Sequence, residues 1–430
     1  MKNKIKDNAF IKSTLILLFG GFAGKLIGFL LKIIITRNLG AEAMGLFSLL
    51  SPTTSLLSTI AVFSYPTALS KLISDKSYRT KDLFTSVIPI SIIINIIIII
   101  FMIITSKYIS TTLFKESRLY LPIICISLTM PFITISSIIK GYFWGKQNMF
   151  PYMLSNFIEQ ITRITLIIFF LSKINNMIYK ICFIILVNIV GEIISQLVML
   201  LFIPKIKVKN LTINKLAVKD TMKISTSNTI SKLIGSFSHF LEPIILTNML
   251  LLLGYSKDYI IYEYGVINAY SLSLLLMPQF FTQNMSTSLI PELSKQYSKR
   301  NYYMCNKRIK QVILLSSFIG GISTIIITLF PNFFLNLLYK TNEGIDYIRF
   351  LSPFIILFYI QYPLADSLQS LGRSKVALKI SIKSTIIRIF SLIIFSLFKL
   401  GMYSLVLTII INLIVTTYMY YIEIKKILSN

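Results

Sequence analysis

Two lysines of this chain lie inside long apolar stretches, where a charge is unfavourable. Lys25 falls near the middle of the apolar run 11–36, and its tetrapeptide Lys-Leu-Ile-Gly recurs at 232–235, beginning with Lys232. A cation at bilayer depth costs about 3 kcal/mol unless it faces a polar interior. Two such cations in matching sequence contexts indicate a pathway for an anionic molecule, with Lys25 and Lys232 as phosphate-binding groups.

Further lysines could extend this pathway. Lys25 and Lys32 fall on one stripe of a helix together with two glycines, which would let a ligand approach the cations closely. Lys379 and Lys383 share a stripe of a later apolar run. The alternative is structural: the glycines form a packing seam between helices, and the lysines extend toward the membrane surface.

An acid and the single histidine of the chain lie on the same helical face as Lys232. These residues are His239 and Glu242, and Pro243 follows directly. Proline removes a backbone donor, so we expect a local break in the hydrogen-bond ladder there. Glu242 and His239 could bind a proton or a sodium ion. Alternatively, Glu242 only neutralises Lys232 or His239.

Other polar residues within the apolar runs could likewise bind a ligand or only hold the structure together. Glu159 and Arg163 are spaced i, i+4, which favours an ion pair within one helix. Neutral and acidic groups on two later runs could bind sugar hydroxyls or hold helices together. These groups are Gln279, Gln283, Asn284, Gln361 and Asp366.

Composition indicates which elements must position these residues. With 55% hydrophobic residues, 14% charged residues and a mean hydropathy of +0.75, the chain of 430 residues is predicted to be an all-α integral membrane protein. The formal net charge of +27 is spread over short loops, which argues against nucleic acid as a partner. Twelve apolar runs predict twelve transmembrane helices. They lie at about 11–36, 43–70, 82–105, 119–139, 149–172, 177–203, 224–251, 264–290, 309–338, 347–370, 376–398 and 401–422.

The charges between the runs predict an orientation. Lys and Arg number 26 in the segments on the side of both termini and 10 in the alternate loops. The positive-inside rule therefore places both termini in the cytoplasm of a cell-membrane protein. The basic stretch 204–223 separates six runs from six. We expect an N-terminal lobe at 1–203, a cytoplasmic linker at 204–223 and a C-terminal lobe at 224–430.

The two halves also share short sequence matches. These occur in the same order in both halves, which favours an internal duplication. Because each half has an even number of spans, the two lobes are predicted to be parallel repeats around a central cavity.

Chemistry on covalent bonds is not predicted. The sequence has no GxxxxGK[ST] loop for nucleotide phosphates, one histidine, and three cysteines without metal-ligand spacing. We therefore expect a protein that is not an enzyme and needs no cofactor, apart from the proton or sodium ion considered above.

Three segments together resemble the polysaccharide-transport branch of the multidrug/oligosaccharidyl-lipid/polysaccharide (MOP) flippase superfamily, in particular its stage V sporulation protein B group. They are residues 24–47, residues 137–149 with the sequence Lys-Gly-Tyr-Phe-Trp-Gly-Lys-Gln-Asn, and residues 158–163. Pro278 and Pro291 sit where that group has prolines. By position, Lys25 corresponds to a basic residue of the family's first span, and Arg37 lies at the outer end of that motif.

The resemblance implies two six-helix bundles around a cationic cavity. Such a protein moves a polyprenyl-diphosphate-linked saccharide from the inner to the outer leaflet by alternating access. The substrate would be lipid II or another precursor of the cell wall or of a surface polysaccharide, and the protein would act as a monomer among membrane lipids.

Two other functions stay open. One is a multidrug or organic-cation antiporter of the same superfamily, which would prefer an acidic cavity. The other is a membrane glycosyltransferase or polysaccharide polymerase, which would have longer outer loops than this sequence offers.

Overall fold

The computed structural model describes residues 2–204 and 214–428, and within these ranges the chain forms helices and no strand. The side chains of residues 2–23, of Lys25 and Leu428, and of several positions in 284–292 including Asn284, lie outside the description. The first half contains α1 (Lys2–Val62), α2 (Tyr65–Ser74), α3 (Thr80–Tyr108), α4 (Tyr120–Gly145), α5 (Phe150–Phe170) and α6 (Met177–Leu200). The second half contains α7 (Lys215–Leu252), α8 (Lys257–Gly265), α9 (Leu272–Leu275), α10 (Gln279–Ser298), α11 (Tyr302–Leu329), α12 (Pro331–Tyr339), α13 (Ile345–Ser370), α14 (Ser374–Leu397) and α15 (Tyr403–Leu428).

Ten helical stretches of the described residues are long and apolar enough to cross a membrane. Two further predicted spans are not counted separately for structural reasons. Helix α1 contains the first predicted run and most of the second, whose last residues lie in α2, and the eighth run is divided among several short helices. The twelve predicted spans are therefore all accounted for by helices.

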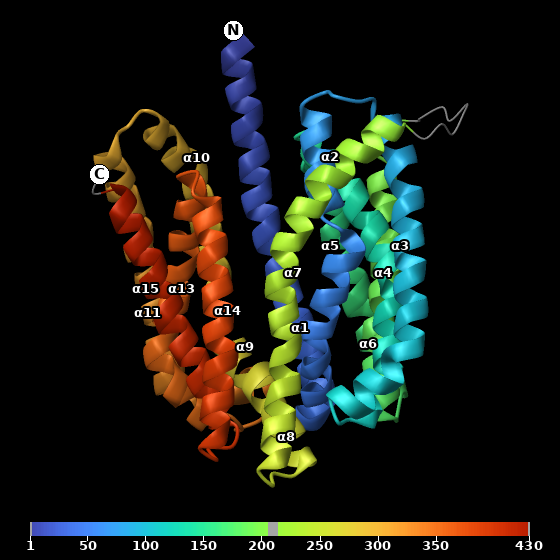
Figure 1. The fold of residues 1–430 in the computed structure, drawn as a ribbon, viewed down its shortest axis with the longest axis vertical. Coiled ribbons are helices and arrows are strands. Elements are labelled where there is room, and N and C mark those ends of the chain that lie inside the picture. The colour runs from blue at the N-terminus through green and yellow to red at the C-terminus, as the bar shows by residue number, and fades with distance from the viewer. Residues whose placement is uncertain (1, 205–213, 429–430) are drawn as a thin grey trace. The chain divides into compact units, whose positions relative to one another are not determined.

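A glycine separates the two predicted runs in α1. Gly40 has φ 74° and ψ 178°, a conformation that breaks the helix and that residues with a Cβ adopt at a cost. The segments before and after Gly40 are thus two helices joined at a sharp change of direction, as the course of the chain in Figure 1 shows.

The predicted run 264–290 is not one helix. It passes through the end of α8, a π-helical segment at Val266–Ser271, α9, a turn before Pro278, and α10. Proline at the N-cap of α10 lacks the donor that would continue the ladder from α9. Pro243 lies inside α7, which continues from Lys215 to Leu252, so the donor that proline lacks does not end this helix. A single missing donor is tolerated in a long membrane helix.

Contacts between Cα atoms divide the chain into two units. Unit 1 comprises Met1–Leu39 and Leu49–Phe240, and unit 2 comprises Gly40–Ser48 and Leu241–Asn430. Unit 1 therefore includes the first part of α7, which the sequence analysis placed in the C-terminal lobe. The predicted linker 204–223 lies in part outside the described residues, at 205–213.

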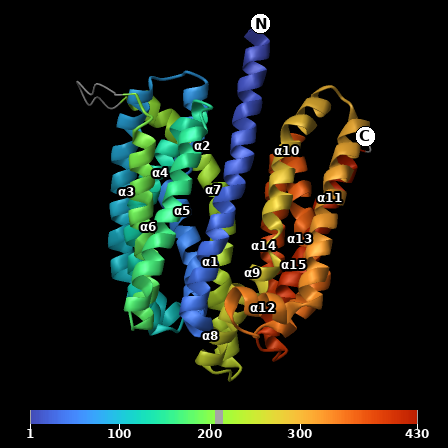
Figure 2. The same ribbon diagram turned by 180° about the vertical axis from the view of Figure 1, so that it is seen from behind.

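The same pattern of helix packing occurs in both units. In unit 1, α4 contacts α2, α3 and α6, and α5 contacts α6. In unit 2, α13 contacts α10, α11 and α15, and α14 contacts α15. Figures 1 and 2 show the helices of each set side by side in both views. The second, third, fourth, fifth and sixth spans of one unit thus correspond to the eighth to twelfth of the other, as the parallel repeats require.

Each unit has a hydrophobic cluster at the corresponding place. In unit 1 the cluster joins the ends of α2 and α4 to the start of α3, with Tyr65, Leu83 and Phe143 fully buried or nearly so. In unit 2 it joins the ends of α10 and α13 to the start of α11, with Leu293 and Leu368 fully buried. Packing of this kind fixes the register of each trio of helices.

Candidate functional site

Four charged residues of unit 1 form one buried ion cluster. Arg163 of α5 pairs with Glu159 one turn earlier, with 2.6 Å between Nη2 and Oε1. Oε1 of Glu192 in α6 lies 3.7 Å from the same guanidinium. Lys140 of α4 lies 3.5 Å from Glu192 and 4.0 Å from Glu159. The predicted pair of Glu159 with Arg163 is confirmed, and the cluster extends it to three helices.

The surroundings of this cluster are closely packed. Glu159 and Glu192 are 4% and 6% exposed. A Cβ at Gly191 would lie 2.9 Å from Nε of Arg163, so the glycine leaves room for the guanidinium beside α6. Two acids balance two bases within 4 Å, which is the arrangement that buried charges need. The cluster therefore joins α4, α5 and α6.

A second buried pair lies in unit 2. Arg388 of α14 donates from Nη2 to Oε1 of Glu242 of α7 at 2.9 Å, and its Nε lies 2.5 Å from Oε2 of the same carboxylate. A hydrogen bond between two charged groups is stronger than one between neutral groups. Sequence reasoning missed Arg388 as the partner of Glu242, because the two residues are 146 positions apart and no local spacing connects them.

The predicted cavity lysines differ from these paired cations. Lys32, Lys232, Lys379 and Lys383 are exposed, and within the described parts of the chain the structure gives none of them an ion pair. The side chain of Lys25 lies outside the described residues. Arg37 and His239 are exposed, and each has an interaction partner. Arg163 and Arg388 thus pair with glutamates, whereas these four lysines are exposed and have no ion pair among the described residues.

The predicted polar groups of unit 2 lie between helices. Gln279 donates to the hydroxyl of Tyr362 at 2.5 Å, and Asp366 accepts from Ser286, so that α10 and α13 are joined twice. Gln361 donates to the carbonyl oxygen of Leu413 at 3.2 Å and thereby joins α13 to α15. Gln283 is half-buried and has an interaction partner. The side chain of Asn284 lies outside the described side chains. These contacts correspond to the interhelical role that the sequence left open.

The described residues do not bring together a metal site. Among them, no group of three or more His, Cys, Asp or Glu side chains could hold a metal ion. The acids at membrane depth named above instead form hydrogen bonds or ion pairs with neighbouring helices.

Comparisons with known proteins agree with this picture. The family model for "Polysaccharide biosynthesis protein" matches residues 10–297, and the model "MatE" matches residues 266–394. Stage V sporulation protein B of Bacillus subtilis is 28% identical over 97% of this chain and 84% of that protein. Lipid II flippase MurJ of the same organism is 21% identical over 86% of this chain and 74% of that protein.

Solved structures show the same fold. The inward-facing structure of a multidrug resistance MATE family transporter of the MOP superfamily superposes with a TM-score of 0.75, at 16% identity over 94% of each chain. A MOP superfamily transporter from Pyrococcus furiosus superposes with a TM-score of 0.66, at 16% identity over 98% of this chain and 95% of that chain. The predicted fold of twelve helices in two lobes is confirmed. The chain belongs to the polysaccharide biosynthesis protein family, and its fold is that of the MOP superfamily.

Proposed function

We propose that this membrane protein is a flippase that moves a polyprenyl-diphosphate-linked saccharide, such as a cell-wall or surface polysaccharide precursor, to the outer leaflet. The cell membrane is its location, both termini face the cytoplasm, and the monomer is the working unit. The family match and the likeness to proteins named as a sporulation protein and as a lipid II flippase support a transporter of this class over an enzyme.

One observation carries the proposal: the lysines within the spans are exposed, while the acids are occupied. Lys232 and Lys32 have no carboxylate within reach among the described residues. An exposed cation facing lipid would cost about 3 kcal/mol, so a polar pathway is the favourable surrounding for these side chains. A diphosphate is the anion that such ammonium groups would bind by charge-assisted hydrogen bonds.

The driving force follows from the charge of the substrate. Each negative charge moved outward from a cell with a negative interior gains about 2.3 kcal/mol per 100 mV. A diphosphate carries about two such charges at neutral pH. The membrane potential acting on the substrate would therefore suffice without nucleotide hydrolysis.

Ion coupling at Glu242 with His239 is a second element of the proposal. A proton or sodium ion at Glu242 would compete with the guanidinium of Arg388 for the same two oxygens. Such a competition would bias the conformational states only if the ion binds them with different affinities.

The rival function is export of organic cations, because the MatE model matches residues 266–394. That substrate would require carboxylates open to the pathway. Glu159, Glu192 and Glu242 are instead paired with basic residues. For the Pyrococcus furiosus transporter, a reverse polarity of the binding pocket has been taken to suggest a different function. The same criterion, applied to the pairing of the acids in this chain, favours an anionic substrate.

Transport by purified protein in vesicles tests the proposal. A fluorescent polyprenyl-diphosphate saccharide in one arm and a fluorescent organic cation in the other would be scored for movement across the bilayer. We expect movement of the saccharide lipid, and its loss in Lys232→Ala but not in Lys223→Ala, a matched change of an exposed lysine on the same helix. Transport of the organic cation with no movement of the saccharide lipid would overturn the proposal.

A further inference from the structure

Each unit carries an apolar groove among three of its own helices. The groove of unit 1 has a volume of about 410 Å³ and lies between α3, α4 and α6. The groove of unit 2 has a volume of about 770 Å³ and lies between α11, α13 and α15. Both volumes fall in the range of about 300–1,000 Å³ that small-molecule sites occupy. The helices are the third, fourth and sixth spans of one repeat and their counterparts in the other.

The two grooves are lined in the same register. On α3 the lining begins with Lys81 and continues with Phe84, Thr85 and Ile88. On α11 it begins with Lys310 and continues with Ile313, Leu314 and Ser317. Both sets follow the spacing i, i+3, i+4, i+7, which places each on one helical stripe. A lysine thus begins the stripe in both repeats, although the residues that follow differ.

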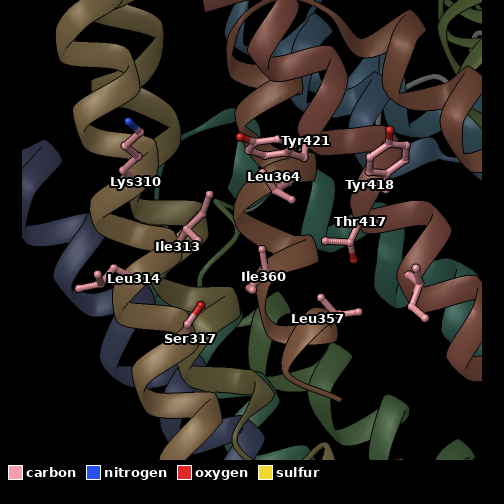
Figure 3. Close-up of a pocket in the computed structure, with 11 residues that line it drawn as sticks. Lys310, Ile313, Leu314, Ser317, Leu357, Ile360, Leu364, Thr417, Tyr418 and Tyr421 are labelled. Carbon is pink, nitrogen blue, oxygen red and sulfur yellow. The ribbon is translucent and has the colours of Figure 1, made fainter. Parts of the chain in front are cut away.

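The lysine lies at one end of its groove. Figure 3 shows Lys310 at the same end as Tyr421, with Ile313, Leu314 and Ser317 following along α11 toward the other end. Leu364, Ile360 and Leu357 follow each other in the same direction along α13. The groove therefore has a polar end and an apolar body, which is the chemical profile of a lipid.

The predicted topology places both lysines toward the same surface of the membrane. Lys81 is the second residue of α3, and Lys310 lies in the early part of α11. An even number of spans precedes each of these helices, so both helices start on the same side. In the proposed orientation this side is the cytoplasmic one, where anionic phospholipids give the membrane its negative surface potential.

We propose that each groove holds one anionic phospholipid of that leaflet, with an acyl chain along the apolar body and the phosphate beside Lys81 or Lys310. Each set of lining residues contains a single cation. One ammonium matches the single charge of a phosphodiester better than the two charges of a diphosphate. Each groove also lies within one unit and occurs in both, as expected for resident lipids. This inference is independent of the transported substrate.

Glutamine substitutions test whether the charges of Lys81 and Lys310 hold the lipid phosphate. The full-length protein would be placed in nanodiscs with equal amounts of phosphatidylglycerol and phosphatidylcholine, and retained lipids would be counted by native mass spectrometry. We expect two retained phosphatidylglycerol molecules per protein, and each of Lys81→Gln and Lys310→Gln should weaken the retention of one of them by about fivefold. Lys307→Gln is the matched control, because Lys307 is exposed on the same helix but does not line the groove.

A separate substitution fills the apolar body of the groove and tests whether an acyl chain lies there. Ser317→Trp occupies the groove of unit 2 while Lys310 stays in place, and we expect it to release the lipid as effectively as Lys310→Gln does. Retention of phosphatidylglycerol at the wild-type level in the double variant Lys81→Gln/Lys310→Gln would overturn the proposal. Equal effects of Lys307→Gln and Lys310→Gln would also overturn it, as would retention of an added polyprenyl phosphate in preference to phosphatidylglycerol.

Discussion

The bases Lys140 of α4 and Arg163 of α5 and the lysines Lys232 of α7 and Lys379 of α14 belong to the same membrane-spanning fold but have opposite surroundings. Lys140 and Arg163 lie within 4 Å of two buried glutamates, whereas Lys232 and Lys379 are exposed and have no ion pair among the described residues. The difference is set by the positions of the glutamates, which lie beside Lys140 and Arg163. A cation with a nearby carboxylate holds helices together, and a cation without one is the group that we propose to bind an anionic substrate.

Breaking the buried cluster should give the largest effect. Arg163→Gln leaves Glu159 and Glu192 with only Lys140, and an uncompensated buried charge destabilises by about 3–5 kcal/mol. We expect a marked fall in the thermal unfolding temperature and in the yield of folded protein. Transport per folded molecule, measured in vesicles, should stay close to wild type. A variant of normal stability that cannot transport would place Arg163 in the pathway instead.

The pair in unit 2 can be tested by a double-mutant cycle. Glu242→Gln and Arg388→Gln should each destabilise the protein, and the double variant should be more stable than the sum of the two single effects predicts, by an interaction of up to about 3 kcal/mol.

The Glu242 variant also tests ion coupling. Glu242→Gln should lose the dependence of flipping on an imposed proton or sodium gradient while it still binds substrate. A response equal to wild type would leave Glu242 as a counter-charge of Arg388 alone.

The exposed lysines of α14 should affect transport and not stability. Lys379→Gln/Lys383→Gln removes two charges that share one helical stripe, and loss of a hydrogen bond to a charged group costs about 1.5–3 kcal/mol. We expect at least a tenfold fall in the flipping rate with an unchanged unfolding temperature. Lys375→Gln on the same helix is the control, since this exposed lysine lies in its first turn. A fall of equal size in the control would indicate a general effect of surface charge.

The smallest effect is expected at a polar contact outside the membrane spans. The hydroxyl of Tyr78 donates to Asp220 at 2.6 Å, and this hydrogen bond raises the pKa of Tyr78 above its ordinary value of 10.0. The contact is therefore fully present below pH 10 and is lost as pH rises through the raised pKa. Tyr78→Phe should lower the unfolding temperature slightly at pH 8. If Tyr78→Phe lowered the unfolding temperature more at pH 11 than at pH 8, the assignment of this hydrogen bond would be wrong.

The fold could largely be predicted from the sequence, because long apolar runs and loop charges are local signals. The division of the run 264–290 into short helices was not predicted, since a π-helical segment leaves no clear mark in hydropathy. The ion pair of Glu159 with Arg163 was predicted from its helical spacing. The bond from Arg388 to Glu242 was not, because it depends on the packing of two helices far apart in the chain. The grooves beside Lys81 and Lys310 likewise required the arrangement of three helices.

Accessibility of position 232 tests the central claim, that a lysine without an acidic partner lines an aqueous pathway for an anionic lipid. The three native cysteines are buried and would be replaced by alanine, after which Lys232→Cys would be labelled in vesicles with a membrane-impermeant thiol reagent. Lys223→Cys on the same helix is the control. We predict that the thiol at 232 is labelled and that added polyprenyl diphosphate slows this labelling without affecting position 223. A thiol at 232 that stays unlabelled, or that is labelled at the same rate with and without the diphosphate, would contradict the account.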